Sequence, residues 1–431
     1  MGDAMRGCSR RTFLQSLAGS GLVLPGLIAA KRSHAQSPIS LTLAIWGDIG
    51  SVAAFRNVIA KYKAVRPEVE IKLEVTPFGQ YYQQIDTRLA GRQAPDLFRV
   101  EFQVVGRYAR SRALMDLTPH FPTGGQEFAN AFWQAVNHEG KTFAIPQNTD
   151  TLGIFYNTDI FTKLGIRIPK SLSESWSWGE FMDIARLLRQ RGGVRYSFAM
   201  LWQDSQAYRW LPFLYQHGGQ LLSNDLKTPE IESAKGIETI AWTQAWFKDG
   251  LVPANTSVKS QERPQALFAN GTLGMYIGGD WQMPFLAQNA KDINWAATYM
   301  PRDVAMASDL GGSCTAIHRD TKNPEAAVEF LKFLSSEAVQ RDFTLDGDFL
   351  PVRTSLMRQP LGYRTHPDAR KVFLDQATTV PLHLVRTVVL PTFSRINQRL
   401  ADQLDLAFTS GQAPDVTARN ISSAINSIMR P

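Results

Sequence analysis

The sequence predicts an α/β protein made of two units, each with its own strands and helices. The 431 residues are 44% hydrophobic and 20% charged, which is typical of globular proteins and excludes a disordered, collagen-like or coiled-coil chain. This length is enough for two or three domains with buried cores. Strand and helix patterns alternate early in the chain, and a second α/β series begins near residue 148.

The first 35 residues are expected to be an export signal. Basic residues, including Arg10 and Arg11, precede an apolar stretch over residues 13–30, and small residues lead up to Ala35. Residues 9–15, with the sequence SRRTFLQ, resemble the twin-arginine export consensus. The apolar stretch is short and rich in glycine for a membrane span, which needs about 20 apolar residues. We therefore expect cleavage after Ala35 and a periplasmic protein.

The charge and the cysteine content argue against nucleic-acid binding, an intramolecular disulfide and a lipid anchor. Loss of the expected signal leaves 41 basic and 38 acidic residues, and no Lys/Arg-rich run remains, so nucleic-acid binding is not expected. Cys8 leaves with the signal, and Cys314 is then the single thiol, so no intramolecular disulfide is expected. Cys8 also lacks the preceding apolar residues that lipid attachment requires, which favours a free form over a lipoprotein.

The first unit follows a β-α-β-α-β pattern. Alternating apolar residues predict strands over 39–45 and 71–75, and a short apolar run predicts a third strand over 97–100. Helical periodicity between them predicts helices over 55–62 and about 82–89. This order is typical of an open, mostly parallel sheet, in which ligands bind at the carboxyl ends of the strands.

The second unit begins after a boundary at residues 143–146. A strand is predicted over 151–157, and Ser177 and Glu180 have the spacing of a capping box that opens a helix. Further helical patterns cover residues 233–248, 323–334 (with Asn323 as the cap), 393–408 and 415–428.

Side chains that suit a carbohydrate follow the strands of the first unit. Trp46 and Asp48 follow the first strand, Tyr82 lies in the loop after the second, and Glu101 follows the third. An aromatic ring can lie against the C–H face of a sugar, while carboxylates accept hydrogen bonds from its hydroxyl groups. We therefore expect these four residues to contact a ligand.

Nucleotide, zinc and nucleophile motifs are not supported. Residues 140–142 resemble the end of a P-loop but lack its earlier glycine, and His138 lacks a second histidine because Thr142 stands in its place. No metal or cofactor is predicted. Gly311 and Gly312 lack the spacing of a nucleophile elbow and are expected to serve a hinge or a close approach of backbone to ligand.

Short segments across the mature chain carry a family resemblance. They lie, in order, at residues 94–97, 144–157, 177–181, 268–275, 278–281 and 323–334. Together they resemble the bacterial extracellular solute-binding proteins of family 1, the sugar-binding receptors of ABC importers. The resemblance implies the type II periplasmic binding protein fold, in which crossover segments join two lobes around a cleft. We expect lobe 1 at 36–147 and 303–352, and lobe 2 at 148–302 and 353–431.

The resemblance also implies ligand contacts and a function. Asp150 corresponds to an acidic contact of maltodextrin-binding relatives, Trp281 to a stacking tryptophan, and Trp202 and Asp204 to another acidic and aromatic segment. The implied protein is a monomeric, non-enzymatic receptor that delivers a sugar or oligosaccharide to a membrane permease.

Two other functions stay open at this point. An exported carbohydrate-cleaving enzyme would use two carboxylates such as Glu101 and Asp150, which glycosidases hold about 5 to 10 Å apart. The same receptor fold could instead bind a phosphorylated polyol such as glycerol 3-phosphate. In that case we expect Arg or Lys in the cleft, with Arg353 as the candidate.

Overall fold

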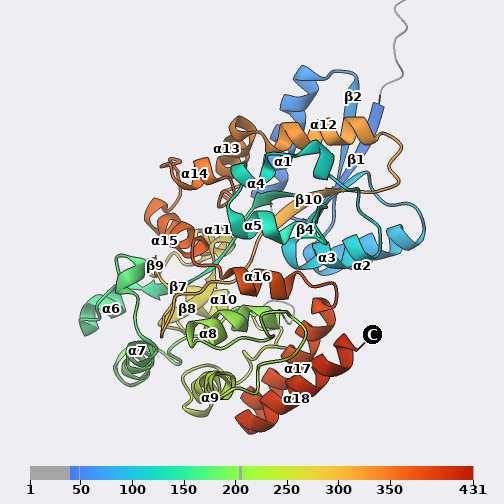
Figure 1. The fold of residues 1–431 in the computed structure, drawn as a ribbon. Coiled ribbons are helices and arrows are strands. Elements are labelled where there is room, and N and C mark those ends of the chain that lie inside the picture. Colours follow the sequence, from blue (N-terminus) through green and yellow to red (C-terminus); the bar gives the residue numbers. More distant parts are fainter. Residues whose placement is uncertain (1–38, 48, 203–205, 431) are drawn as a thin grey trace, which may run out of the picture. The chain divides into compact units, whose positions relative to one another are not determined.

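The computed structural model describes residues 39–47, 49–202 and 206–430. The expected signal, Asp48 and Asp204 lie outside these residues. A five-stranded sheet has the strand order β2-β1-β3-β10-β6 (Figure 1). Its strands are β1 (Ile39–Ile45), β2 (Val69–Val75), β3 (Leu97–Glu101), β6 (Ile145–Asn148) and β10 (Ser313–Ile317).

The first three predicted strands are confirmed, but the sheet is mixed. β1 pairs in parallel with both β2 and β3, as the β-α-β-α-β pattern predicts. β10 then pairs antiparallel with β3 and with β6. The prediction missed these two pairings because β10 comes from a segment more than 200 residues further along the chain.

Helices cover the five-stranded sheet (Figure 1). α1 (Ile49–Val65) and α2 (Phe78–Ala90) connect the parallel strands and begin several residues before the predicted helices, and α3 (Phe102–Arg110) follows β3. α12 (Pro324–Ser335) and α13 (Glu337–Asp346) pack against α1. Asn323 precedes α12 as expected, but its side chain donates to Ser40 O and does not cap the helix.

A three-stranded sheet has the order β8-β7-β9, with β7 (Leu152–Asn157) in the centre. β8 (Met275–Gly279) and β9 (Trp295–Thr298) both pair antiparallel with β7. α7 (Trp178–Arg191) begins at the predicted capping box, in which Ser177 and Glu180 exchange side-chain and backbone hydrogen bonds. α9 (Ala234–Lys248), α17 (Phe393–Ser410) and α18 (Pro414–Met429) match the predicted helices and pack against one another.

Shorter elements complete the fold. They are η1 (Thr118–His120), α4 (Gly124–Glu127), α5 (Asn130–Ala135), β4 (Asn137–His138), β5 (Lys141–Thr142), α6 (Thr158–Leu164), η2 (Leu172–Glu174), η3 (Ala207–Trp210), α8 (Leu211–Gln216), α10 (Pro264–Ala269), η4 (Asp280–Gln282), α11 (Met283–Asn289), α14 (Thr354–Met357), α15 (Pro367–Ala377) and α16 (Leu382–Val388).

Residues 149–151 and 299–312 lead the chain from one sheet to the other, and we call them the crossing segments. Gly312, on the second segment, has φ +97°, and a Cβ atom at this position would lie 2.3 Å from Asn148 O. Only glycine tolerates both conditions. The close backbone approach seen at Gly312 is to Asn148 at the end of β6, and the expected approach to a ligand stays a prediction.

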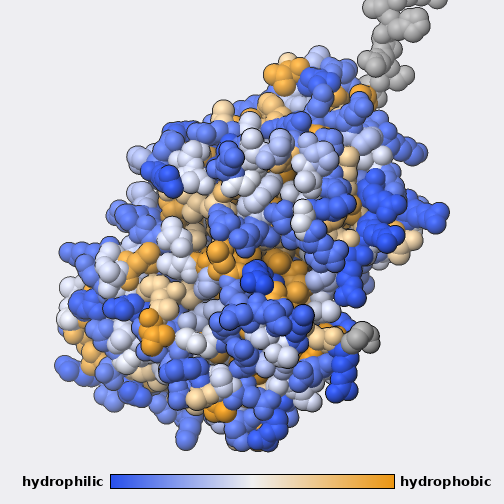
Figure 2. All heavy atoms as spheres, in the orientation of Figure 1, coloured by the Kyte–Doolittle hydropathy of each residue, from blue (hydrophilic) through white to orange (hydrophobic). Residues whose placement is uncertain are grey.

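The surface seen in Figure 2 is mainly hydrophilic, with apolar residues in small groups. The exposed large apolar side chains among the described residues are Val65, Val75, Val304, Leu382 and Leu406. Within the same part of the chain, no helix is both long and apolar enough to cross a membrane.

Candidate ligand-binding site

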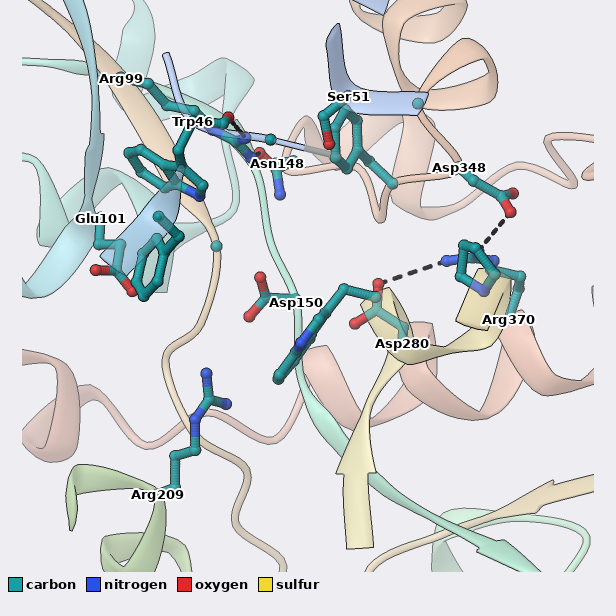
Figure 3. A pocket seen from close by; sticks show the side chains of 17 residues that line it. Trp46, Ser51, Arg99, Glu101, Asn148, Asp150, Arg209, Asp280, Asp348 and Arg370 are labelled. Atoms are coloured by element: carbon teal, nitrogen blue, oxygen red, sulfur yellow. Dashed lines mark hydrogen bonds and ion pairs between the residues drawn. The ribbon is translucent and has the colours of Figure 1, made fainter. Parts of the chain in front are cut away.

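A cavity of about 390 Å³ lies where the carboxyl ends of β1 and β3 meet the end of β8 and the crossing segments (Figure 3). This volume is in the range of small-molecule sites. The lining combines aromatic, acidic, basic and small residues: Trp46, Gly47, Ser51, Phe78, Arg99, Glu101, Asn148, Asp150, Arg209, Asp280, Trp281, Pro284, Gly312, Gly347, Asp348, Phe349 and Arg370.

Five of the residues that we expected at the ligand lie together in this lining. Trp46 follows β1, Glu101 ends β3, and Trp281 follows β8. Asp150 and Gly312 lie on the two crossing segments. Side chains separated by more than 200 residues therefore meet at one cavity.

Tyr82 and Trp202 are not part of the lining. The Tyr82 hydroxyl accepts a hydrogen bond from the backbone N–H of Glu101 at 2.8 Å, and this bond holds the end of β3 in place. Trp202 is buried, and its indole N–H donates to Thr256 O at 3.1 Å. Trp202 is therefore a core residue, whereas Tyr82 is partly buried and packs against Trp46 of the lining.

Arg353 also lies elsewhere. Its guanidinium pairs with Glu127 at 2.7 Å and donates to Ser335 O at 2.6 Å, and it is absent from the lining. The structure does not bring Arg353 to this cavity, because Glu127 and Ser335 O engage its guanidinium elsewhere. Asp48 and Asp204 lie outside the described residues.

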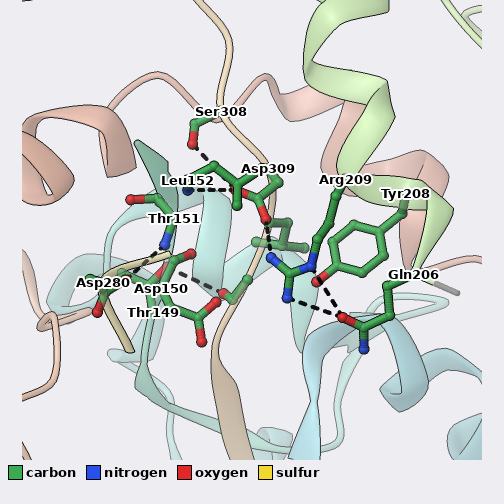
Figure 4. A network of polar contacts seen from close by, with 12 residues as sticks. Thr149, Asp150, Thr151, Leu152, Gln206, Tyr208, Arg209, Asp280, Ser308 and Asp309 are labelled. Carbon is green, nitrogen blue, oxygen red and sulfur yellow. Dashed lines mark hydrogen bonds and ion pairs between the residues drawn. The ribbon is translucent and has the colours of Figure 1, made fainter. Parts of the chain in front are cut away.

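Arg209 is the centre of a buried polar network (Figure 4). Its Nη1 lies 3.0 Å from Asp309 Oδ2, while its Nε and Nη2 donate to Gln206 Oε1 at 3.2 and 3.0 Å. Gln206 donates in turn to Glu101 Oε1 at 3.3 Å, and Asp309 Oδ1 accepts the N–H of Leu152 at 3.1 Å. The guanidinium of Arg209 thus links the last residue of β3 to the first residue of β7.

An arginine lies over each of the two indole rings of the cavity. The central carbon of Arg99 is 4.5 Å from the ring centroid of Trp46, and that of Arg209 is 4.6 Å from Trp281. Arg99 also donates to Trp46 O at 2.8 Å and to Asn148 Oδ1 at 3.2 Å. These cation–π contacts and hydrogen bonds hold the indoles in place at the cavity wall.

Arg370 provides a second buried ionic group. Its Nη1 lies 3.5 Å from Asp280 Oδ2, and its Nη2 lies 2.6 Å from Asp348 Oδ2. Asp280 Oδ1 also accepts the N–H of Thr151 at 3.1 Å. Arg370 is 1% exposed, so α15 delivers a buried positive charge to this wall of the cavity.

Asp150 differs from the other acids of the cavity. Its Oδ1 is buried and has no hydrogen-bond partner among the described residues. Burial, followed by the negative charges of Asp309 and Glu101, raises the pKa of Asp150 to about 7, although Arg209 opposes this rise. Burial likewise raises the pKa values of Glu101 and Asp280.

The sequence reasoning missed Asp280 and the three arginines of the cavity. Asp280 had a local signal, because it directly precedes Trp281 in the segment that carried the family resemblance. Arg209 directly follows the segment 202–208 that the resemblance also marked. Arg99 and Arg370 had none, since their positions depend on β3 and α15 packing in three dimensions.

The fold and the cavity define a two-lobed type II periplasmic binding protein, with the cavity between the ends of the two sheets. The family model described as bacterial extracellular solute-binding protein matches residues 46–341, and the chain belongs to this family.

Individual relatives agree with this assignment. The diacetylchitobiose binding protein of Streptomyces coelicolor is 23% identical over 336 residues, which cover 76% of this chain and 76% of that protein. Among solved structures, an ABC substrate-binding protein from Listeria monocytogenes in complex with cycloalternan has a TM-score of 0.78 at 20% identity, covering 91% of this chain and 99% of that chain. The GacH receptor of Streptomyces glaucescens, solved unliganded and with acarbose, has a TM-score of 0.75 at 23% identity, covering 91% and 98%. The two structural likenesses show the fold.

Proposed function

We propose that the protein is the substrate-binding protein of an ABC importer and that it binds a sugar or an oligosaccharide in the cavity. Family membership supports the binding role, and the relatives with diacetylchitobiose, cycloalternan and acarbose support a carbohydrate ligand. The observation that carries the proposal is the lining itself, in which two indoles and several carboxylates from both sheets surround one cavity. This combination suits a ligand with apolar faces and a rim of hydroxyl groups.

The proposed contacts divide into two chemical roles. Trp46 and Trp281 pack against the C–H faces of the sugar, and Glu101 and Asp150 accept hydrogen bonds from its hydroxyl groups. Gly312 lies in the lining and brings the backbone of the second crossing segment to the ligand. Since the contacts come from both lobes, ligand binding favours a closed arrangement of the lobes.

The proposed receptor performs no chemistry on its ligand. Glu101 and Asp150 would be the carboxylates of a glycosidase, but the family consists of binding proteins. A phosphorylated polyol is also not favoured, because carboxyl groups outnumber guanidinium groups in the lining of the cavity. Incubation with oligosaccharides, followed by chromatography, tests this point. Release of shorter products would show that the protein is an enzyme and not a receptor.

A thermal-shift screen of sugars and polyols tests the main proposal. A ligand present at 100 times its dissociation constant should stabilise the protein by about 2.7 kcal/mol. Calorimetry then measures the affinity of each hit. If no sugar or polyol raises the melting temperature, the carbohydrate assignment fails.

We also propose export to the periplasm, cleavage near Ala35, a monomeric mature protein and delivery of the ligand to a membrane permease. The extracellular solute-binding family supports an exported protein and a permease partner. The lobe boundaries at 147/148, 302/303 and 352/353 belong to the same proposal.

A further inference from the structure

The charges of the cavity are not balanced. Among the described residues, the lining holds three guanidinium groups and four carboxyl groups: Arg99, Arg209, Arg370, Glu101, Asp150, Asp280 and Asp348. Asp309 adds a further carboxyl directly behind the lining, at 3.0 Å from Arg209. By number, acidic groups therefore exceed basic groups around the cavity, and burial raises the pKa values of Glu101, Asp150 and Asp280.

Each arginine of the lining lies near more than one acid, and Arg99 lowers the pKa values of both Glu101 and Asp150. Arg370 lies between two carboxylates, Asp280 and Asp348. Arg209 pairs with Asp309 and also lies close enough to Glu101 and Asp150 to lower their pKa values. Two or three acids thus share each of these guanidinium groups.

Asp150 is the acid of the lining whose carboxyl group has the fewest polar partners. It forms no salt bridge among the described residues, and its buried Oδ1 has no hydrogen-bond partner there. A Cβ atom on Gly311 would lie 1.8 Å from this oxygen, so the bare backbone of the second crossing segment packs directly against it. In Figure 3, the Asp150 carboxyl lies near the middle of the lining, between Glu101 and Asp280.

We infer that the ligand is an amino sugar and that its positively charged amino group pairs with Asp150. This inference rests on the proposed function and specifies its ligand. A hydroxyl group can donate a hydrogen bond to the Asp150 carboxyl group, but it carries no charge that would stabilise the ionised form of this acid. An ammonium group donates hydrogen bonds and also stabilises the ionised form of Asp150 beside the acids Glu101 and Asp309.

The same arrangement disfavours anionic ligands. A phosphate or a carboxylate would enter a cavity in which carboxyl groups outnumber guanidinium groups and in which several acids already lie near Arg209. Like charges in a buried site repel each other, which favours rejection of sugar phosphates and uronic acids.

Matched sugars that differ at one substituent test the inference. The probes are the hydroxyl, amino and acetamido forms of glucose, galactose and mannose, together with cellobiose, chitosan dimer and diacetylchitobiose. Calorimetry at pH 7 and low salt should show the amino form binding about tenfold or more tightly than its two neutral counterparts, because hydrogen bonds between charged groups are the strong ones.

The binding results can overturn the inference without overturning the proposed function. A neutral form that binds as tightly as its amino counterpart overturns the inference and leaves the proposed function standing. The inference also fails if none of these probes binds, while a neutral sugar outside the set that binds would still support the proposed function. The proposed function itself fails only if the full sugar and polyol screen gives no ligand.

Asp150→Asn provides the residue-level test, because it keeps the shape of the side chain and removes its charge. The variant should lose about tenfold or more in affinity for the amino sugar and much less for the hydroxyl form. Asp342→Asn is the matched control, since Asp342 is a half-exposed acid that pairs with Lys61 away from the cavity. Equal losses for both sugars in Asp150→Asn would mean that Asp150 does not recognise charge.

Discussion

The guanidinium of Arg209 lies over the indole of Trp281, with its central carbon 4.6 Å from the ring centroid. The same guanidinium pairs with Asp309 on the second crossing segment. One wall of the candidate site is therefore joined to the network that links the two sheets. Changes at Trp281 and at Arg209 should have different consequences for binding and for stability.

Trp281→Ala should weaken sugar binding about thirtyfold, because truncation of a central aromatic contact commonly costs about 2 kcal/mol or more. The ligand-free variant should keep most of its stability, since the indole is only partly buried. Calorimetry with ligand and thermal melts without it separate the two effects. Trp133→Ala is the control, because this indole is also partly buried but packs on Phe128 away from the cavity, so its loss should leave the affinity unchanged. Lost stability with intact affinity in Trp281→Ala would remove Trp281 from the site.

Arg209→Met should destabilise the folded protein by about 3 to 5 kcal/mol, since it leaves the buried carboxylate of Asp309 without its partner. Urea denaturation measures the free energy of unfolding. The double variant Arg209→Met, Asp309→Asn should recover part of this loss, because it no longer buries an unpaired charge. A double variant that is as unstable as the single one would show that the ion pair is not the cause.

The stability of the ligand-free protein should depend on the ionisation of Asp150. The pKa of this carboxyl is about 7 in the folded protein, against an ordinary value of 3.8. The unfolded chain therefore releases this proton at lower pH, and ionisation favours unfolding. The contribution to stability is fully present below about pH 4 and is lost as the pH rises to about 7. The difference in unfolding free energy between wild type and Asp150→Asn should fall across this window, and a difference that stays constant with pH would contradict the shift.

Ligand binding should decrease the radius of gyration, because the proposed contacts come from both lobes and favour a closed arrangement. Small-angle scattering with saturating ligand and without ligand measures this change. Trp281→Ala at ligand concentrations far below its dissociation constant should scatter like the unliganded protein. An unchanged radius at saturation would argue against closure.

Replacing Arg10 and Arg11 by lysine should leave unprocessed precursor in the cytoplasm, because the twin-arginine route reads the arginine pair. Cell fractionation followed by immunoblotting measures the precursor and the mature form. Lys31→Gln is a control that changes a basic residue beyond the apolar stretch. Normal export of the double lysine variant would show that another route is used.

The sequence by itself determined the elements whose signals are local. The alternation of apolar residues predicted β1, and the spacing of Ser177 and Glu180 predicted the first turn of α7, because backbone periodicity and capping act over a few residues. The position of Trp46 and Glu101 at one edge followed from the parallel pairing of β1 and β3.

Only the tertiary structure decided which polar side chains reach the cavity. Arg353 pairs with Glu127, 226 residues away, and Arg370 reaches Asp280, 90 residues away. Neither partner can be identified from the local pattern. Tyr82 and Trp202 likewise found partners inside the protein. Buried polar and charged groups must be paired wherever the fold brings a partner, so their positions follow from long-range packing and not from the residues beside them.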